Sequence, residues 1–286
     1  MYYEKIAIAI GVCVLASTVS SAAKRDWNTE AREAIHHIFN SDKTLDVDNV
    51  NGQIQIVGDG GSTIRVDGEK IIRAIDQKEV ERAKREVVLD INEKDGVAQL
   101  YVNGPFRDNS HGSQDHSFHE HGDREYEVTY NFTIRVPRET GLQLRTVNGE
   151  VKTDQTSGKF DVRGVNGGVT MTSVAGSGKI NTVNGPLLVS FRENPKAATS
   201  FHSVNGRIEA TFQPNLGADL SFKTVNGATY TDFDATALAS PAGTAERKDG
   251  RFVYKANRMS SVRIGSGGPE LSFETVNGAI RIQKAH

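Results

Sequence analysis

The fold is decided between Thr146 and Gly185, where the chain reads TVNGEVKTDQTSGKFDVRGVNGGVTMTSVAGSGKINTVNG. Three Val-Asn-Gly triplets lie in this stretch, and successive asparagines are 18 residues apart. Each interval holds a second glycine turn near its middle, which leaves strands of about six or seven residues, too short for helices. Asparagine tolerates a left-handed backbone and glycine adopts it freely, so the pair reverses the chain tightly. The stretch therefore predicts short β-strands joined by repeated Asn-Gly corners.

The same triplet recurs across most of the chain. It occurs eight times, and in seven copies an apolar side chain stands four residues before the asparagine. The seven asparagines are Asn51, Asn148, Asn166, Asn184, Asn205, Asn226 and Asn277. The eighth copy, at Asn103, has Gln99 and Pro105 in the neighbouring positions, and we interpret it as a coincidence. Glycine accounts for 28 of 286 residues, an excess over the usual ~7% that these corners explain.

Two all-β architectures use such corners. In a β-solenoid, or β-helix-like stack, each Asn-Gly is a corner and equivalent residues stack from coil to coil, which permits asparagine ladders. In an antiparallel β-meander or sandwich, each pair instead closes a hairpin. The near-constant spacing of an identical corner favours the solenoid, and the meander or sandwich is the alternative.

The sequence outside the repeats has a different character. Asp76 and Glu79 resemble a capping box, and Val80, Ala83 and Val87 fit one face of a short helix. Alternation predicts a strand over residues 126–136, ended by Pro137. Residues 34–39 fit a strand or a helix, and we favour a strand because they lead directly into the first repeat.

Two further segments complete this description. Strands are expected on both sides of a turn at Asp95-Gly96, and again over residues 252–254 and 262–264. Residues 235–250 are small and polar and lack periodicity, which predicts an insertion loop.

The repeated motifs resemble a known family. The run from Thr146 to Gly185, the terminal GGPELSFETVNGAIRI and the opening DNVNGQIQIVG look like the putative-adhesin domain of bacterial envelope proteins. The resemblance covers residues 40–286 and implies an exported all-β, β-helix-like fold. It implies no catalytic residues. The chain departs from the family pattern by a histidine-rich stretch and by a long segment before the last repeat.

The first 23 residues have the pattern of a secretory signal peptide. Lys5 is followed by an apolar run over residues 6–16, and Ser20-Ser21-Ala22-Ala23 places small residues at the cleavage site. The run is too short to span a bilayer, which needs about 20 residues. The single cysteine, Cys13, lies within it, so the exported chain is expected to contain no thiol and no stable membrane span. We expect a location in the periplasm, at the cell surface or outside the cell.

We therefore divide the chain into three parts. Residues 1–23 are the signal peptide, residues 24–136 an N-terminal β region with the short helix, and residues 137–286 the Val-Asn-Gly β-repeat region. The last two are expected to form one continuous domain.

A histidine-rich segment over residues 107–125 is the one candidate for metal binding. It holds His111, His116, His119 and His121 among three carboxylates, and these residue types bind zinc and related metals. The spacing matches no closed site, and Gly, Ser and Asn surround it. We expect a solvated loop, with adventitious or dedicated metal binding as alternatives, and assign no metal ligand or cofactor.

The remaining signals argue against catalysis. Gly176-Ser-Gly-Lys179 lacks the first glycine and the terminal Ser or Thr of a phosphate-binding loop, and no Gly-x-Ser-x-Gly motif is present. The 34 basic and 36 acidic residues nearly balance, which disfavours nucleic-acid binding.

The sequence thus predicts an exported, non-catalytic envelope or secreted protein. It would act as an adhesin-like module that binds a polysaccharide, a protein or another copy of itself. The alternative is a polysaccharide-acting enzyme on a β-helix scaffold, which should carry aromatic platforms for sugar rings. The only tryptophan is Trp27, next to the signal peptide, and the tyrosines form no regular row.

Overall fold

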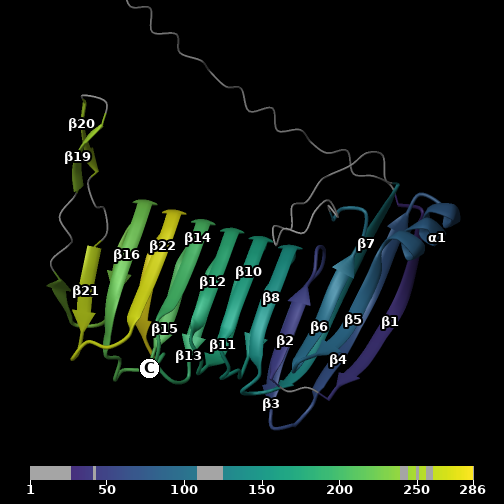
Figure 1. The fold of residues 1–286 in the computed structure, drawn as a ribbon, viewed down its shortest axis with the longest axis horizontal. Helices are drawn as coiled ribbons and strands as arrows, with labels where there is room; N and C mark the ends of the chain where they lie inside the picture. Colours follow the sequence, from purple (N-terminus) through teal and green to yellow (C-terminus); the bar gives the residue numbers. More distant parts are fainter. Residues whose placement is uncertain are drawn as a thin grey trace, which may run out of the picture.

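The computed structural model describes residues 27–40, 43–107, 125–238, 244–248, 251–255 and 260–285 (Figure 1). The expected signal peptide and the four clustered histidines lie outside these residues. The described chain is mostly β, with one helix, and most of its strands belong to two large mixed sheets.

Sheet A has ten strands, parallel in its middle and antiparallel at its N-terminal end. In spatial order they are β1 (Thr29–Phe39), β4 (Ile64–Ala74), β7 (Tyr126–Pro137), β3 (Ile54–Asp59), β9 (Val151–Asp154), β11 (Val169–Val174), β13 (Leu187–Phe191), β15 (Ile208–Phe212), β23 (Ile280–Lys284) and β17 (Thr229–Thr231).

Sheet B has eleven strands and antiparallel pairs at both of its ends. In spatial order they are β18 (Ala235–Leu238), β21 (Ser260–Ile264), β16 (Ala218–Asn226), β22 (Glu270–Asn277), β14 (Thr199–Asn205), β12 (Gly178–Asn184), β10 (Phe160–Asn166), β8 (Gly141–Asn148), β2 (Thr44–Asp48), β6 (Val97–Asn103) and β5 (Val88–Lys94). A separate hairpin pairs β19 (Thr244–Lys248) with β20 (Arg251–Lys255).

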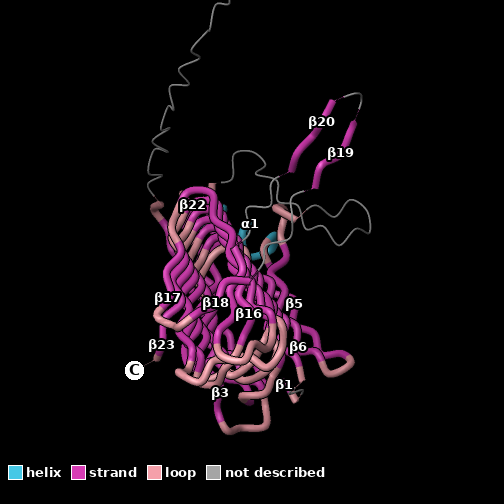
Figure 2. The backbone as a smooth tube through the Cα atoms, turned by 90° about the vertical axis from the view of Figure 1, so that its left-hand side faces the viewer, coloured by secondary structure: helices cyan, strands magenta, loops and turns pink. Residues whose placement is uncertain are grey.

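The two sheets lie face to face and enclose the core (Figure 2). Phe191 of sheet A meets Phe201 of sheet B edge to face, with ring centroids 6.2 Å apart, and Phe212 meets Phe273 at 6.4 Å. Along β8 and its neighbours the inward side chains are buried and the outward ones are accessible, as expected when one face of a strand packs on the core.

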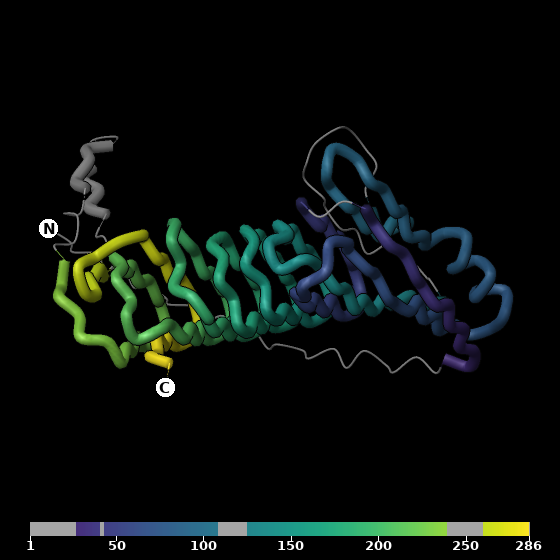
Figure 3. The backbone as a smooth tube through the Cα atoms, turned by 90° about the horizontal axis from the view of Figure 1, so that it is seen from below, coloured from purple at the N-terminus to yellow at the C-terminus, as the bar shows by residue number. Residues whose placement is uncertain are grey.

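Each of the seven Val-Asn-Gly triplets that have an apolar residue four positions before the asparagine leads from a strand of sheet B to a strand of sheet A, and so closes no hairpin. At Asn51, for example, the flanking strands are β2 and β3. We call the two strands and the triplet between them a level, named by its asparagine. Successive levels pair in register, for example Asn166 with Asn148 and Val169 with Val151. The levels follow one another along the long axis of the molecule (Figure 3). This arrangement of two facing sheets fits a sandwich-like description as well as a stack of coils.

The glycine of the triplet is required by the closeness of the next level. A Cβ atom on Gly149 would lie 2.0 Å from the carbonyl oxygen of Gly52, and one on Gly185 would lie 2.3 Å from that of Gly167. Two residues before the asparagine, a buried hydroxyl often binds the same carbonyl: Thr182 Oγ1 donates to Gly167 O over 3.1 Å. None of the seven asparagines has a positive φ, so the left-handed backbone expected at these positions is wrong. The close stacking of the levels is what requires glycine after the asparagine.

The levels do not follow chain order. From one end, their asparagines run 51, 148, 166, 184, 205, 277 and 226. The C-terminal strands β22 and β23 thus lie between levels that precede them in sequence, and Figure 1 shows β22 in yellow between β14 and β16. The 51-residue interval before Asn277 contains β18 and β21, which pair antiparallel at the end of sheet B.

The N-terminal end contains the only helix of the described residues, α1 (Gln77–Glu86). The predicted cap is confirmed, because Asp76 accepts a hydrogen bond from the backbone N–H of Glu79 over 2.9 Å. Val80 and Ala83 are buried in the core, as their spacing predicted, and Val87 is buried as well but caps the C-terminus of the helix. This helix is far shorter than the bilayer, and no described helix is long and apolar enough to cross one.

Most of the expected strands are confirmed, and one expectation is wrong. Residues 34–39 lie in β1, residues 126–136 lie in β7, and Asp95-Gly96 turns between β5 and β6 with positive φ at both residues. Residues 235–250 are not simply a loop, since they contain β18 and β19. Each of these strands is held by an antiparallel partner. β18 pairs with β21, which is distant in sequence, and β19 pairs with β20 across a hairpin.

Candidate ligand-binding face

The outward side of sheet B carries aligned rows of side chains. Because the strands pair in register, the outward residues at one position of the repeat form a line across the sheet. The valines before the asparagines form one such line, and Val165, Val183 and Val225 are exposed. Next to this line, at the corner, lie the repeated asparagines.

The seven asparagines form a continuous ladder. Each Nδ2 donates to the Oδ1 of the neighbouring asparagine over 2.7–2.9 Å, as in the bond from Asn166 to Asn148 at 2.9 Å. The first member, Asn51, instead donates to the carbonyl oxygen of Val128 at 3.3 Å. Asn103 takes no part and bonds Asp90, which confirms that the eighth triplet lies outside the pattern.

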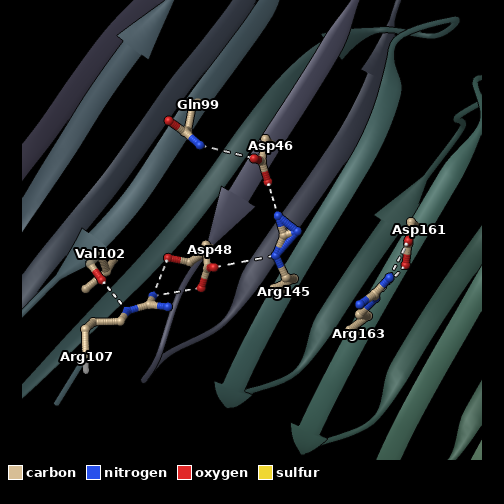
Figure 4. A network of polar contacts seen from close by, with 8 residues as sticks. All are labelled: Asp46, Asp48, Gln99, Val102, Arg107, Arg145, Asp161 and Arg163. Atoms are coloured by element: carbon tan, nitrogen blue, oxygen red, sulfur yellow. Dashed lines mark hydrogen bonds and ion pairs between the residues drawn. The ribbon is translucent and has the colours of Figure 1, made fainter. Parts of the chain in front are cut away.

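The N-terminal half of this face contains a charged network (Figure 4). The Arg107 guanidinium contacts Asp48 Oδ1 at 2.7 Å and donates to the carbonyl oxygen of Val102 at 3.1 Å, while it lies 4.4 Å from the centre of the Tyr101 ring. The Arg107 and Asp48 side chains are only 2% and 8% exposed. Such a pair fixes the chain at residue 107 against sheet B, and removing one partner would leave a buried charge.

The neighbouring charges are paired with each other. Arg145 contacts Asp46 at 3.1 Å and Asp48 at 3.5 Å, and Arg163 makes two hydrogen bonds to Asp161, of 3.0 and 2.9 Å. The carboxylates of Asp46, Asp48 and Asp161 are therefore each paired with a guanidinium.

The C-terminal half presents a hollow with a different character. It has a volume of about 250 Å³ and lies over β12, β14, β22 and β16. Ser200, Ser272 and Ser221 form a line through it, because Ser200 is in register with Ser272 and Ser272 with Ser221. We call these three serines, with Asn181 beside them, the serine trough. Within the described residues, none of the four side chains makes a hydrogen bond to the protein.

Charged rims border the trough. On one side His202, Glu274 and Lys223 lie in register; Lys223 binds Glu274, and His202 Nδ1 is 3.9 Å from it. On the other side Arg263 makes two hydrogen bonds of 2.7 Å to Asp219. These bonds lower the pKa of the Asp219 carboxyl below its usual range.

The trough lacks the arrangement of a nucleophilic active site. Such a site needs a hydroxyl in hydrogen-bond reach of a base that a third group orients. His202 makes no hydrogen bond to a serine among the described residues, and Glu274 is already bound by Lys223. No cluster of three or more potential metal-ligating side chains occurs in the described ranges either. Free hydroxyl and amide groups leave hydrogen bonding to a polar ligand as the available chemistry.

A second hollow, of about 490 Å³, lies near the turn that follows β3. Two of its charged groups have partners. Asp59 accepts from Gly61 N at 2.8 Å and from Arg65 at 2.7 Å, and these bonds lower the pKa of Asp59. Arg138 donates to Gln155 at 3.1 Å. Lys43 and Glu139 also line this hollow, which has no row of aligned hydroxyl groups like that of the serine trough.

The sequence analysis did not predict the trough. The serines of the trough belong to no recognisable sequence motif. They form a line only because β22 lies between β14 and β16, which depends on contacts between residues far apart in the sequence. One signal was present, because LSF precedes both of the last two triplets, at Leu220 and Leu271. In-register stacking of those two levels would have aligned their serines.

Several solved structures are similar to this chain. A putative cell adhesion protein from Clostridium sporogenes is 13% identical, with a TM-score of 0.44 over 90% of this chain and 100% of its own. A putative adhesin from Bacteroides fragilis is 13% identical, with a TM-score of 0.34 over 88% of this chain and 97% of its own. A putative lipid binding protein from Parabacteroides distasonis is 11% identical, with a TM-score of 0.29 over 91% of this chain and 98% of its own. No family model matches the chain, and no curated protein matches it in sequence.

Proposed function

We propose that this chain is an exported, non-catalytic, adhesin-like protein of the cell envelope or of the secreted fraction, and that the outer face of sheet B contacts its ligand. One observation carries the proposal. Four hydrogen-bonding side chains that have no partner among the described residues gather in one hollow, on a face whose other charged groups are largely paired. Unused donors and acceptors of this kind are available to a ligand.

Other features support the same function. The motifs of residues 40–286 resemble an exported adhesin domain, and the N-terminal pattern predicts a signal peptide with its cleavage site at Ala22 or Ala23. We read the levels as coils of a β-solenoid, in which residues 24–136 provide the first coil and a cap and residues 137–286 the remaining coils. A rigid stack of this kind holds surface side chains at fixed spacings, which suits recognition of a repetitive surface ligand.

The purified mature chain tests this function in a binding screen. Intact bacterial cells, envelope polysaccharides and matrix proteins are offered, and hydrolysis of each polysaccharide is followed in parallel. We expect saturable binding to at least one surface without turnover. Absence of binding to all of them, or turnover that is lost when a single carboxylate is replaced, would contradict the proposal.

A further inference from the structure

We propose that the serine trough is a carbohydrate subsite that takes a short stretch of a neutral, hydroxyl-rich glycan. The inference rests on the proposed function and names the ligand class of the same face. Its ligand would lie across β14, β22 and β16, along the long axis of the stack.

The spacing of the hydroxyl groups supports a chain-like ligand. Neighbouring strands are about 4.8 Å apart, and Ser261 of β21 continues the line because it is in register with Ser221. Four hydroxyls thus follow one another over about 14 Å at a regular interval. Each is one donor and two acceptors, which is the same hydrogen-bonding capacity as that of a sugar hydroxyl.

The charges of the rims favour a neutral ligand. The Glu274 carboxylate is held by Lys223 and the Asp219 carboxylate by Arg263, so neither sign dominates beside the trough. A carboxylate that already has one cationic partner retains lone pairs for hydroxyl donors. Asn181 adds an amide, which both donates and accepts.

The floor of the trough disfavours a lipid ligand. The phenylalanines below it, Phe201, Phe222 and Phe273, are 1%, 5% and 1% exposed, so they pack inward and offer almost no apolar surface. Binding would depend on hydrogen bonds repeated along the chain of the ligand. Affinity should therefore rise with the number of sugar residues.

The serine trough exists because the Asn277 level lies inside the stack. Ser272 supplies the central hydroxyl of the line, and it lies there only because β22 is inserted between β14 and β16. If the levels followed chain order, Ser200 would adjoin Ser221, and Ser272 would lie beyond them.

Calorimetric titration of the full mature chain with neutral hexasaccharides of glucose and of N-acetylglucosamine tests the proposal. A hexasaccharide of galacturonate is the charged comparison. We expect saturable binding of a neutral hexasaccharide, weaker binding of the trisaccharide, and at least a tenfold loss of affinity in the double variant Ser221→Ala, Ser272→Ala. The matched control, Thr172→Ala with Thr211→Ala on the outer face of sheet A, should bind as the parent does. Circular dichroism and thermal unfolding verify the fold of both variants.

The contrary results are distinct from failure of the proposed function. Equal affinity in the trough variant and in the control, or binding of the acidic hexasaccharide alone, would overturn the carbohydrate subsite. If the chain binds a cell surface in the screen but no neutral hexasaccharide, the subsite is wrong and the adhesin-like function stands. If it binds neither, both are wrong.

Discussion

Two segments of this chain share eight of 14 residues and yet occupy different places in the fold. Residues 218–231 read ADLSFKTVNGATYT, and residues 269–282 read PELSFETVNGAIRI. The first forms the Asn226 level, at the end of the stack, and the second forms the Asn277 level, inside it. The shared strand and corner therefore do not decide the position of a level.

The residues after the corner account for the difference. Ile280 and Ile282 are 0% and 1% exposed, whereas Thr229 and Thr231, their register partners, are both exposed. Burying an isoleucine side chain contributes about 1.5–3 kcal/mol, and burying an unpaired hydroxyl is unfavourable. The Asn277 level, with its isoleucines, is thus more stable inside the stack. The Asn226 level, with its threonines, can lie at the end of the stack, where these side chains stay exposed. Position follows apolar content after the corner, not order along the chain.

The largest loss of stability is expected when the isoleucines of the Asn277 level are replaced by the threonines of the Asn226 level. The double variant Ile280→Thr, Ile282→Thr should lower the free energy of unfolding by about 4–6 kcal/mol, because it deletes buried apolar volume and buries two hydroxyls. Urea unfolding followed by circular dichroism measures the loss. The matched variant Thr229→Val, Thr231→Val should change stability by less than about 0.5 kcal/mol. Similar losses in the two variants would show that the two levels are equivalent.

The phenylalanine stack gives the second contrast. Phe273 lies between Phe201 and Phe222, with ring centroids 4.7 and 5.6 Å away, while Phe222 stacks on no described ring other than Phe273. Phe273→Ala should destabilise the protein by about 3–4 kcal/mol and Phe222→Ala by about 2 kcal/mol, because the end of the stack can relax around the space left. Thermal unfolding of the two variants checks the order, and a larger loss for Phe222→Ala would contradict it.

The asparagine ladder gives a smaller difference. Asn277 takes part in two ladder bonds, to Asn205 and from Asn226, and Asn226 takes part in one. Asn277→Ala should cost about 1–2 kcal/mol and Asn226→Ala about half of that, at roughly 0.5–1.5 kcal/mol for each bond. Denaturant midpoints of the two variants compare them directly. Equal midpoints would mean that the ladder contributes nothing at these levels.

Acid should loosen the terminal level before the interior ones. The pKa of Asp219 is lowered by its hydrogen bond from Arg263. The stabilisation by this pair is therefore fully present above the unfolded-state pKa of 3.8 and is lost as the pH falls through the lower, folded-state value. Hydrogen exchange in β16 and β21 should accelerate relative to β14 over that range. Asp219→Asn should show fast exchange already at neutral pH, and an unchanged ratio in the parent would refute the effect.

The sequence predicted local features well. Asn-Gly corners, the Asp76 cap and the alternation of residues 126–136 each depend on neighbouring residues, and all three occur in the structure. The order of the levels depends on contacts between residues 51 or more positions apart, and local sequence patterns do not predict such contacts. The serine trough follows from that order, so the candidate site could not be predicted. The association of β18 with β21 was missed for the same reason.

Engineered disulfides test the inserted position of the C-terminal level most directly. In a Cys13→Ser background, Ser200→Cys with Ser272→Cys places thiols on adjacent strands, at a Cα spacing near 4.8 Å that a disulfide can span. Ser200→Cys with Ser221→Cys places them two strands apart, at about 9.6 Å, which is too far. Mild oxidation of the folded proteins, followed by mass spectrometry, should give a complete disulfide in the first variant and free thiols in the second. The opposite result would place the levels in chain order and remove the basis of the serine trough.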